Sequence, residues 1–99
     1  QRAPEVALAW YNLGLMQRRR GDIAAALEAY GQALVLDPNN AEYQQNHAVA
    51  RLLGGDIEAA RQGFRTAIGL LNAQGRTQDA AALQQKAQGF VKLDAEPLP

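Results

Sequence analysis

The stretch GDIAAALEAYGQA at residues 21–33 occurs again, little changed, as GDIEAARQGFRTA at residues 55–67. Both copies begin with Gly-Asp-Ile, both place an aromatic residue (Tyr30 or Phe64) at the tenth position, and they start 34 residues apart. Self-similarity at a fixed period of roughly 20–50 residues is the sequence signature of repeat architectures. The duplication therefore predicts a fold built from like units placed side by side.

Each copy reads as an amphipathic helix that begins after its Gly-Asp pair. Asp22 and Asp56 suit the N-cap position, where a side-chain oxygen accepts a free backbone N–H. Pro38 is expected to end the first helix, since proline disfavours helical geometry in the residue before it. Recurrence at three- and four-residue spacing indicates one buried face. That face consists of Ile23, Ala26, Leu27, Tyr30, Ala33 and Leu34 in the first copy, and of Ile57, Ala60, Arg61, Phe64, Ala67 and Ile68 in the second.

Another helix precedes each copy. Pro4 suits a first helical turn, and Asn40 can cap the corresponding helix of the second unit. The unit is therefore a pair of helices joined by a short turn, and stacking of such pairs buries the apolar sides that one pair leaves exposed. The preceding helices carry Trp10, Leu13, Gly14 and Gln17 in the first unit, and Tyr43, Gln44, His47, Ala48 and Arg51 in the second.

The first unit resembles the tetratricopeptide repeat at the signature spacings, which are occupied by Trp10, Leu13, Gly14, Ala26, Tyr30, Ala33 and Pro38. It departs from the family at Gln17, where tyrosine is usual, and the second unit departs at Gln44 and His47, in place of Trp and Leu. The resemblance implies an all-α fold of antiparallel helix-turn-helix repeats, stacked as a short right-handed superhelix with five helices. The repeats would occupy residues 7–40 and 41–74.

A final helix is expected from Thr77 to about Leu93. The strict 34-residue register would turn glutamine side chains inward, and burying an unpaired amide costs at least about 1–3 kcal/mol. A slip of about two residues is therefore expected. It buries Ala80, Leu83, Ala87 and Phe90 and leaves Gln78, Gln85, Lys86 and Lys92 in water. Terminal repeats need a polar outer side, so this helix is interpreted as a cap.

Residues 1–93 are expected to form a single domain, and the proline-rich residues 94–99 a disordered tail or linker. The lack of an initiator methionine at Gln1 suggests an excised or processed piece of a longer protein. Ten acidic and ten basic residues give zero net charge, so no general attraction to nucleic acid or to a membrane is expected. No apolar run approaches the roughly 20 residues of a membrane span. The compartment is undetermined, with the cytoplasm as default.

Enzymatic chemistry finds little support in the sequence. His47 is the only histidine and stands at an expected core position, which favours a structural role. The chain has no cysteine and no serine, so neither a metal set nor a nucleophile is evident. We therefore expect no catalytic residue, no metal, no cofactor and no small-molecule substrate.

The three arginines Arg18, Arg19 and Arg20 end the first helix. One reading is a solvated helix C-terminus, where cations complement the carbonyl end of the helix dipole. The alternative is a contact with an acidic peptide or nucleic acid. Without an aromatic stacking platform, and in a neutral domain, nucleic acid is not expected.

In repeats of this kind the first helix of each pair lines the concave side. Asn12 and Asn46 fall in register there, and their amides offer donors and acceptors that suit an extended peptide backbone. The resemblance implies a peptide contact for both, although a solvated surface asparagine is the alternative. The candidate peptide-binding residues are Tyr11, Asn12, Leu15, Arg19, Gln45, Asn46, Val49, Leu52 and Leu53.

The apolar members of this set are expected to form an exposed stripe, and such surface usually marks a contact. The stripe comprises Tyr11, Leu15, Val49, Leu52 and Leu53. The resulting hypothesis is a scaffold or adaptor that binds a peptide or helix of another protein. The rival is self-association, or stacking within a larger repeat protein. A clamp for a C-terminal carboxylate looks incomplete, because Tyr11 and Glu42 stand where basic residues would be needed.

Replacing Ala26 by leucine is expected to destabilise the fold by roughly 1–3 kcal/mol, because a larger side chain overpacks the place where paired helices approach. Thermal unfolding of the two proteins measures the difference. An unchanged melting temperature would contradict the placement of Ala26 at the helix crossing.

Overall fold

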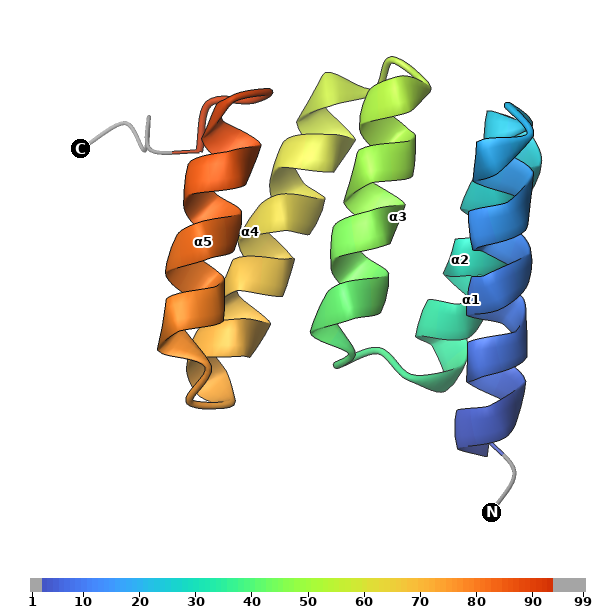
Figure 1. The fold of residues 1–99 in the computed structure, drawn as a ribbon, viewed down its shortest axis with the longest axis horizontal. Helices are drawn as coiled ribbons and strands as arrows, with labels where there is room; N and C mark the ends of the chain where they lie inside the picture. Colours follow the sequence, from blue (N-terminus) through green and yellow to red (C-terminus); the bar gives the residue numbers. More distant parts are fainter. Residues whose placement is uncertain (1–2, 94–99) are drawn as a thin grey trace.

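The computed structural model describes residues 3–93, and within that range it contains five α-helices and no β-strand. Figure 1 shows them as a row of antiparallel helices in chain order. The all-α prediction with five helices is confirmed, whereas the right-handed superhelical twist stays a prediction. The predicted tail, residues 94–99, lies outside the described residues. The helices are α1 (Ala3–Arg19), α2 (Ile23–Leu36), α3 (Ala41–Leu53), α4 (Ile57–Ala73) and α5 (Thr77–Gln88).

Three tight turns reverse the chain in the same way. After α1, the Asp22 N–H bonds to the Gln17 carbonyl at 2.9 Å, and the Gly21 N–H bonds to the Arg18 carbonyl at 3.0 Å. This is the Schellman pattern, in which a left-handed residue ends the helix and satisfies its last carbonyls. Gly21, Gly55 and Gly75 take that place with φ of 87°, 91° and 77°. Glycine is required there because it has no Cβ to oppose a positive φ.

The aspartates after the first two of these glycines begin the next helix. Asp22 Oδ1 accepts from the Ala25 N–H and Asp56 Oδ1 accepts from the Ala59 N–H, both at 3.2 Å. Each Gly-Asp pair therefore ends one helix and caps another, which explains why the pair recurs. The connection from α2 to α3 is different: Asp37 ends α2, and Asn40 caps α3 by accepting from the Tyr43 N–H at 3.0 Å.

The predicted buried face of the duplicated helices is largely confirmed. Tyr30 and Phe64, the two aromatic residues, are the largest fully buried side chains of the described residues. Alanines 26, 33, 60 and 67 are also buried beside them. The prediction fails at Ile57, whose side chain is 44% exposed. In the first unit the equivalent Ile23 packs close to Gly54 at the end of α3.

Small residues let the paired helices approach closely, as expected. A Cβ at Gly14 would lie 2.6 Å from two atoms of the Tyr30 ring, so only glycine leaves room for that ring against α1. In the second pair the roles are exchanged: a Cβ at Gly63 of α4 would lie 2.9 Å from the Cβ of Ala48 on α3. Each crossing therefore contains one glycine, on opposite partners.

The capping helix follows the slipped register. It begins 36 residues after α3 (Thr77 against Ala41), and the predicted alanines 80 and 87 and Leu83 are buried. The predicted wet residues, Gln78, Gln85, Lys86 and Lys92, are exposed.

Two expectations about the end of this helix are wrong. The helix ends at Gln88 rather than near Leu93, because Gly89 follows as its C-cap. The chain then folds back, and the Arg61 Nε donates to the Lys92 carbonyl at 2.8 Å. This reversal leaves Phe90 57% exposed and buries Val91 and Leu93 in its place.

Gly14→Ala is expected to destabilise the protein, because overpacking against Tyr30 costs about 1–3 kcal/mol and exceeds the helix-propensity gain of about 0.5–1 kcal/mol. Gly31→Ala in α2 is the matched control, since a Cβ there meets nothing within 4 Å. The control should gain about 0.5–1 kcal/mol. Urea unfolding measures both, and a stabilised Gly14→Ala protein would contradict the described crossing.

Candidate functional site

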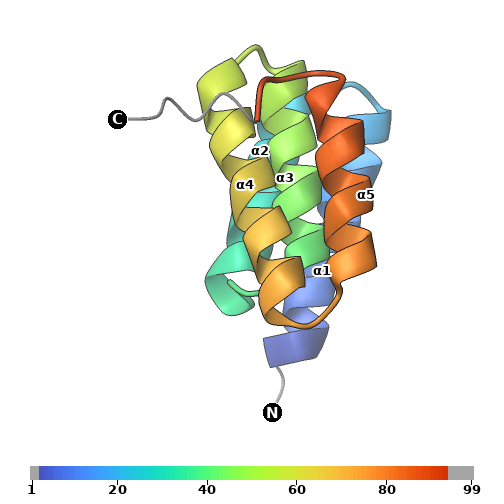
Figure 2. The same ribbon diagram turned by 90° about the vertical axis from the view of Figure 1, so that its left-hand side faces the viewer.

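The predicted site residues lie on α1 and α3. Figure 2 shows α1 and α5 on one side of the molecule, α2 and α4 on the other, and α3 between them. The side of α3 that faces α1 and α5 is therefore the floor of the candidate groove. Asn12, Arg19 and Leu53 are exposed; the half-buried members of the set are Tyr11, Leu15, Gln45, Asn46, Val49 and Leu52.

Tyr11 of α1 contacts α3 through its ring and its hydroxyl group. Its ring stacks on Tyr43, with centroids 4.5 Å apart and an interplanar angle of 24°, and tilts against Tyr30 at 5.7 Å. Burial, followed by the neighbouring tyrosines, raises the pKa of Tyr11. The phenol therefore stays neutral near pH 7 and serves as a hydroxyl, with its ring inside the contact between the two helix pairs.

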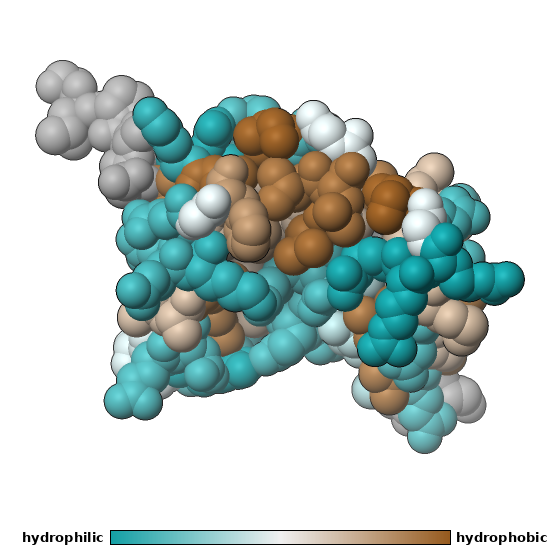
Figure 3. All heavy atoms as spheres, turned by 45° about the horizontal axis from the view of Figure 1, so that its top comes forward, coloured by the Kyte–Doolittle hydropathy of each residue, from teal (hydrophilic) through white to brown (hydrophobic). Residues whose placement is uncertain are grey.

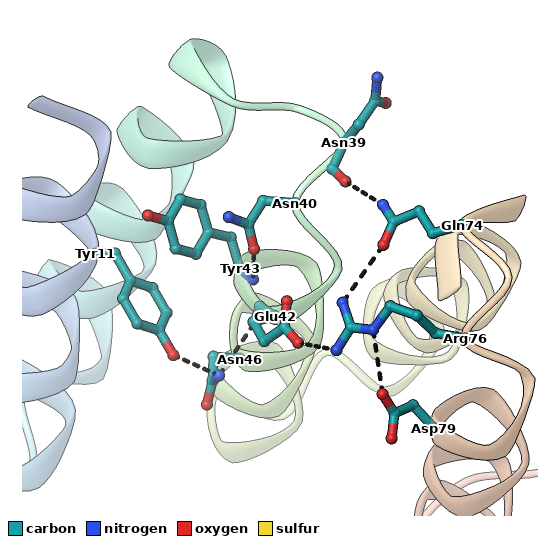
Figure 4. A network of polar contacts seen from close by, with 9 residues as sticks. All are labelled: Tyr11, Asn39, Asn40, Glu42, Tyr43, Asn46, Gln74, Arg76 and Asp79. Atoms are coloured by element: carbon teal, nitrogen blue, oxygen red, sulfur yellow. Dashed lines mark hydrogen bonds and ion pairs between the residues drawn. The ribbon is translucent and has the colours of Figure 1, made fainter. Parts of the chain in front are cut away.

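The two asparagines, expected to be equivalent, are in different situations. Asn46 Nδ2 donates to the Tyr11 hydroxyl at 2.8 Å and to the Glu42 carbonyl at 3.0 Å, as Figure 4 shows for the first bond. These bonds occupy both N–H groups of the amide and leave its oxygen to accept. Asn12 is exposed on α1. Tyr11 thus fixes the orientation of one asparagine, which sequence reasoning did not anticipate.

A polar network joins α3 to the start of α5. Arg76 Nη2 donates to Glu42 Oε2 at 2.5 Å, and its Nε donates to Asp79 Oδ2 at 3.1 Å (Figure 4). The hydrogen bond from Arg76 lowers the pKa of Glu42. Gln74 links the same corner to the preceding turn by donating to the Asn39 carbonyl at 3.1 Å. Because these ion pairs are exposed to solvent, the network mainly fixes geometry.

The sequence contained a signal for this network. Glu42 and Arg76 are 34 residues apart, which is the repeat length, so they occupy equivalent positions of adjacent units with opposite charges. The pair lines a hollow of about 300 Å³ between α3 and α5. The other residues of the hollow are Gln45, Leu71, Asp79, Ala82, Leu83 and Lys86.

The prediction of a continuous exposed apolar stripe is wrong. Val49 and Leu52 pack against the core shared by α3, α4 and α5, and Leu15 packs against the cluster around Tyr30. Leu53 alone of the five stripe residues is exposed. Figure 3 shows apolar side chains gathered instead at one end of the molecule. Leu53 and Ile57 flank the α3–α4 turn at that end, and Phe90 follows α5 there.

Arg18 and Arg19 end α1 and Arg20 follows in the turn; the first of these three arginines has a structural contact. Arg18 Nε donates to the Tyr30 hydroxyl at 3.4 Å, whereas Arg19 and Arg20 are exposed.

His47 is buried with its ring edge toward Tyr30, at 6.4 Å between centroids and 62° between planes. Its Nδ1 is buried and has no hydrogen-bond partner within the described residues. Burial, reinforced by the positive charge of Arg51, lowers the pKa of His47 from 6.5 to about 4.

Within residues 3–93 no three histidine, cysteine or acidic side chains come together as metal ligands would. The same range contains no helix with the length and apolar character that crossing a membrane requires.

Comparison with known proteins relates residues 7–40 to the family described as Tetratricopeptide repeat. "Tetratricopeptide repeat protein 36" of Homo sapiens is 36% identical over 72 residues, which are 73% of this chain and 38% of the relative. The Bos taurus protein of that name is 39% identical over 72 residues, 73% of this chain and 34% of the relative. "Protein FlbA" of Caulobacter vibrioides is 33% identical over 81 residues, 82% of this chain but 13% of the relative. The chain thus spans little more than a third of the first two relatives.

The buried His47 is expected to make stability depend on pH. With a folded pKa near 4 and an unfolded pKa near 6.5, the unfolded chain binds more protons between these values. The free energy of unfolding should therefore fall as pH drops from 6.5 to 4. The variant His47→Leu removes this contribution. Its free energy of unfolding relative to that of the wild type should therefore increase as pH falls towards 4. Urea unfolding at about pH 7 and at about pH 4.5 measures this difference; an equal pH dependence of the two proteins would argue against a buried neutral imidazole.

Proposed function

We propose that this chain, which belongs to the tetratricopeptide repeat family, is a helical-repeat module for protein–protein interaction and binds a peptide or helix of a partner protein. The proposed binding surface is the groove between α1, α3 and α5, and the proposed role is that of a scaffold or adaptor. We also propose that residues 1–93 form one domain, with repeats at 7–40 and 41–74 and a cap at 77–93.

The hollow between α3 and α5 is the observation that carries this proposal. It has an apolar floor, provided by Leu71 and Leu83, and a charged rim that includes Lys86 and Asp79. Such a combination of apolar lining and a few directed polar groups is typical of binding sites. Its volume of about 300 Å³ is sufficient for one side chain of a partner.

The asparagines supply the second element of the proposal. The Tyr11 hydroxyl and the Glu42 carbonyl hold the Asn46 N–H groups, so the amide oxygen is presented in a fixed orientation to a backbone N–H of the partner. Asn12 lies exposed on the neighbouring helix and can use both its donors and its acceptor. Together they are suited to hold an extended backbone while the half-buried Leu15 and Val49 contact its side chains.

The rim carries both signs of charge. Glu42 and Asp79 are offset by Arg76 and Lys86, and Arg19 adds a cation on α1. A partner segment of mixed charge therefore suits the groove better than a strongly acidic or basic one.

Replacing both asparagines by alanine is expected to weaken partner binding. Each lost hydrogen bond is worth about 0.5–1.5 kcal/mol, so the double variant Asn12→Ala/Asn46→Ala should lose roughly 5- to 150-fold in affinity. Pull-down with unchanged and variant proteins identifies the partner, and titration with the purified partner then measures the loss. Gln32→Ala on α2, an exposed amide on the opposite side, is the matched control. Recovery of the same partners in equal amounts by the double variant would contradict the groove.

Tyr11→Phe gives a finer test of the same site. It keeps the ring stacked on Tyr43 but removes the hydroxyl that orients Asn46. We expect a smaller loss than in the double variant, with little change in folding. Unaltered affinity in Tyr11→Phe together with a clear loss in the double variant would assign binding to Asn12 alone.

A further inference from the structure

The segments that follow α1, α3 and α5 lie at one end of the molecule, because the helices alternate in direction (Figure 1). Figure 3, in which this end comes forward, shows apolar side chains gathered over it. Leu53, Ile57 and Phe90 are 56%, 44% and 57% exposed there, and we call this surface the apolar end. Helix pairs stack beside one another, so the α3–α4 turn lies on the outer edge of the stack rather than on a stacking face.

Exposed cations surround these apolar residues on the same segments. Arg20 follows α1, and Lys92 follows α5 near Phe90. Arg19 and Lys86 lie in the last turns of the same two helices and are also exposed. The apolar end therefore combines projecting apolar side chains with positive charge contributed by both edges of the stack.

The acids at the apolar end are already engaged. The carboxylates of Asp22 and Asp56 accept from backbone N–H groups as helix caps, and Glu58 pairs with Arg61. The opposite end of the described residues has the reverse balance, with one base, Arg76, and the acids Glu5, Asp37, Glu42 and Asp79. A net charge of zero thus conceals two ends of opposite sign.

Charge complementarity calls for a negatively charged partner at the apolar end. Three projecting side chains are too few to bury the roughly 800 Å² per partner of a standard protein interface. A lipid surface needs no matching shape, because its affinity is the sum of the apolar area buried among the head groups and the attraction of cations to anionic lipids. An anionic bilayer therefore fits this surface better than a folded protein does.

We propose that the apolar end is a peripheral contact with an anionic lipid surface. Leu53 and Phe90 enter the boundary between head groups and acyl chains, while Arg20 and Lys92 bind the anionic head groups. The acidic opposite end is repelled, so the helices stand with the apolar end towards the bilayer. These four side chains lie outside the proposed groove, so the contact is independent of whether a peptide binds there.

Co-sedimentation with phosphatidylcholine vesicles that contain about one third phosphatidylserine tests the contact, with pure phosphatidylcholine vesicles as the reference. We expect binding to the anionic vesicles only. Binding should decrease markedly between about 20 mM and about 500 mM salt, because salt screens the attraction of the cations to the head groups. Binding to neither kind of vesicle, or to both kinds alike, would overturn the proposal.

The double variant Leu53→Ser/Phe90→Ser tests the apolar side chains. It should lower binding to the anionic vesicles at least roughly tenfold, because two large side chains no longer enter the head-group region. Val35→Ser is the matched control, since Val35 is 74% exposed near the end of α2, at the opposite end of the molecule. Circular dichroism melts establish that both proteins are folded. Equal binding by the double variant and the control would place the contact elsewhere and overturn the proposal.

The double variant Arg20→Gln/Lys92→Gln tests the charges and should lower binding roughly 30-fold. Glu5→Gln, at the opposite end, is the charge control and should not weaken binding. Unchanged binding by the arginine–lysine variant would contradict a role of these cations. Sedimentation velocity covers the remaining occupant: a mass that rises with concentration, is reduced by Leu53→Ser/Phe90→Ser and occurs without vesicle binding would assign the apolar end to a second copy instead.

Discussion

The ring of Tyr30 is enclosed by side chains from both helix pairs. A Cβ at Gly14 of α1 would lie 2.6 Å from the ring, and His47 of α3 meets it edge-on at 6.4 Å between centroids. The ring therefore leaves room only for glycine on one side and meets an uncharged neighbour on the other. A protonated imidazole would lose its hydration without gaining a partner, which is why the pKa of His47 is depressed.

The candidate groove depends on this contact through Tyr11. Tyr11 lies between Tyr30 and Tyr43, so the position of its hydroxyl follows from the stacking of the two pairs. That hydroxyl in turn orients Asn46 on the floor of the groove. On the opposite side, Arg76 and Glu42 fix the start of the capping helix against α3. Packing between repeats thus sets both walls of the surface where the proposed partner binds.

Features carried by local periodicity could be predicted from sequence, and features carried by contacts between distant residues could not. The buried positions of Tyr30 and Phe64 follow from helical spacing. The exposure of Phe90 depends on the helix stop at Gly89 and on the return of the chain to Arg61, which spacing does not record. Likewise, spacing places Leu52 on the concave side but cannot tell that it packs against the core. The bond from Asn46 to Tyr11 spans 35 residues and depends on the angle between units.

The most direct test of this account is a nuclear Overhauser spectrum of the Tyr30 ring protons. If one ring joins the two helix pairs, these protons show contacts both to the α-protons of Gly14 and to the imidazole protons of His47. Contacts to Gly14 without any to His47 would mean that the first pair does not stack on the second as described, and the geometry of the groove would lose its basis.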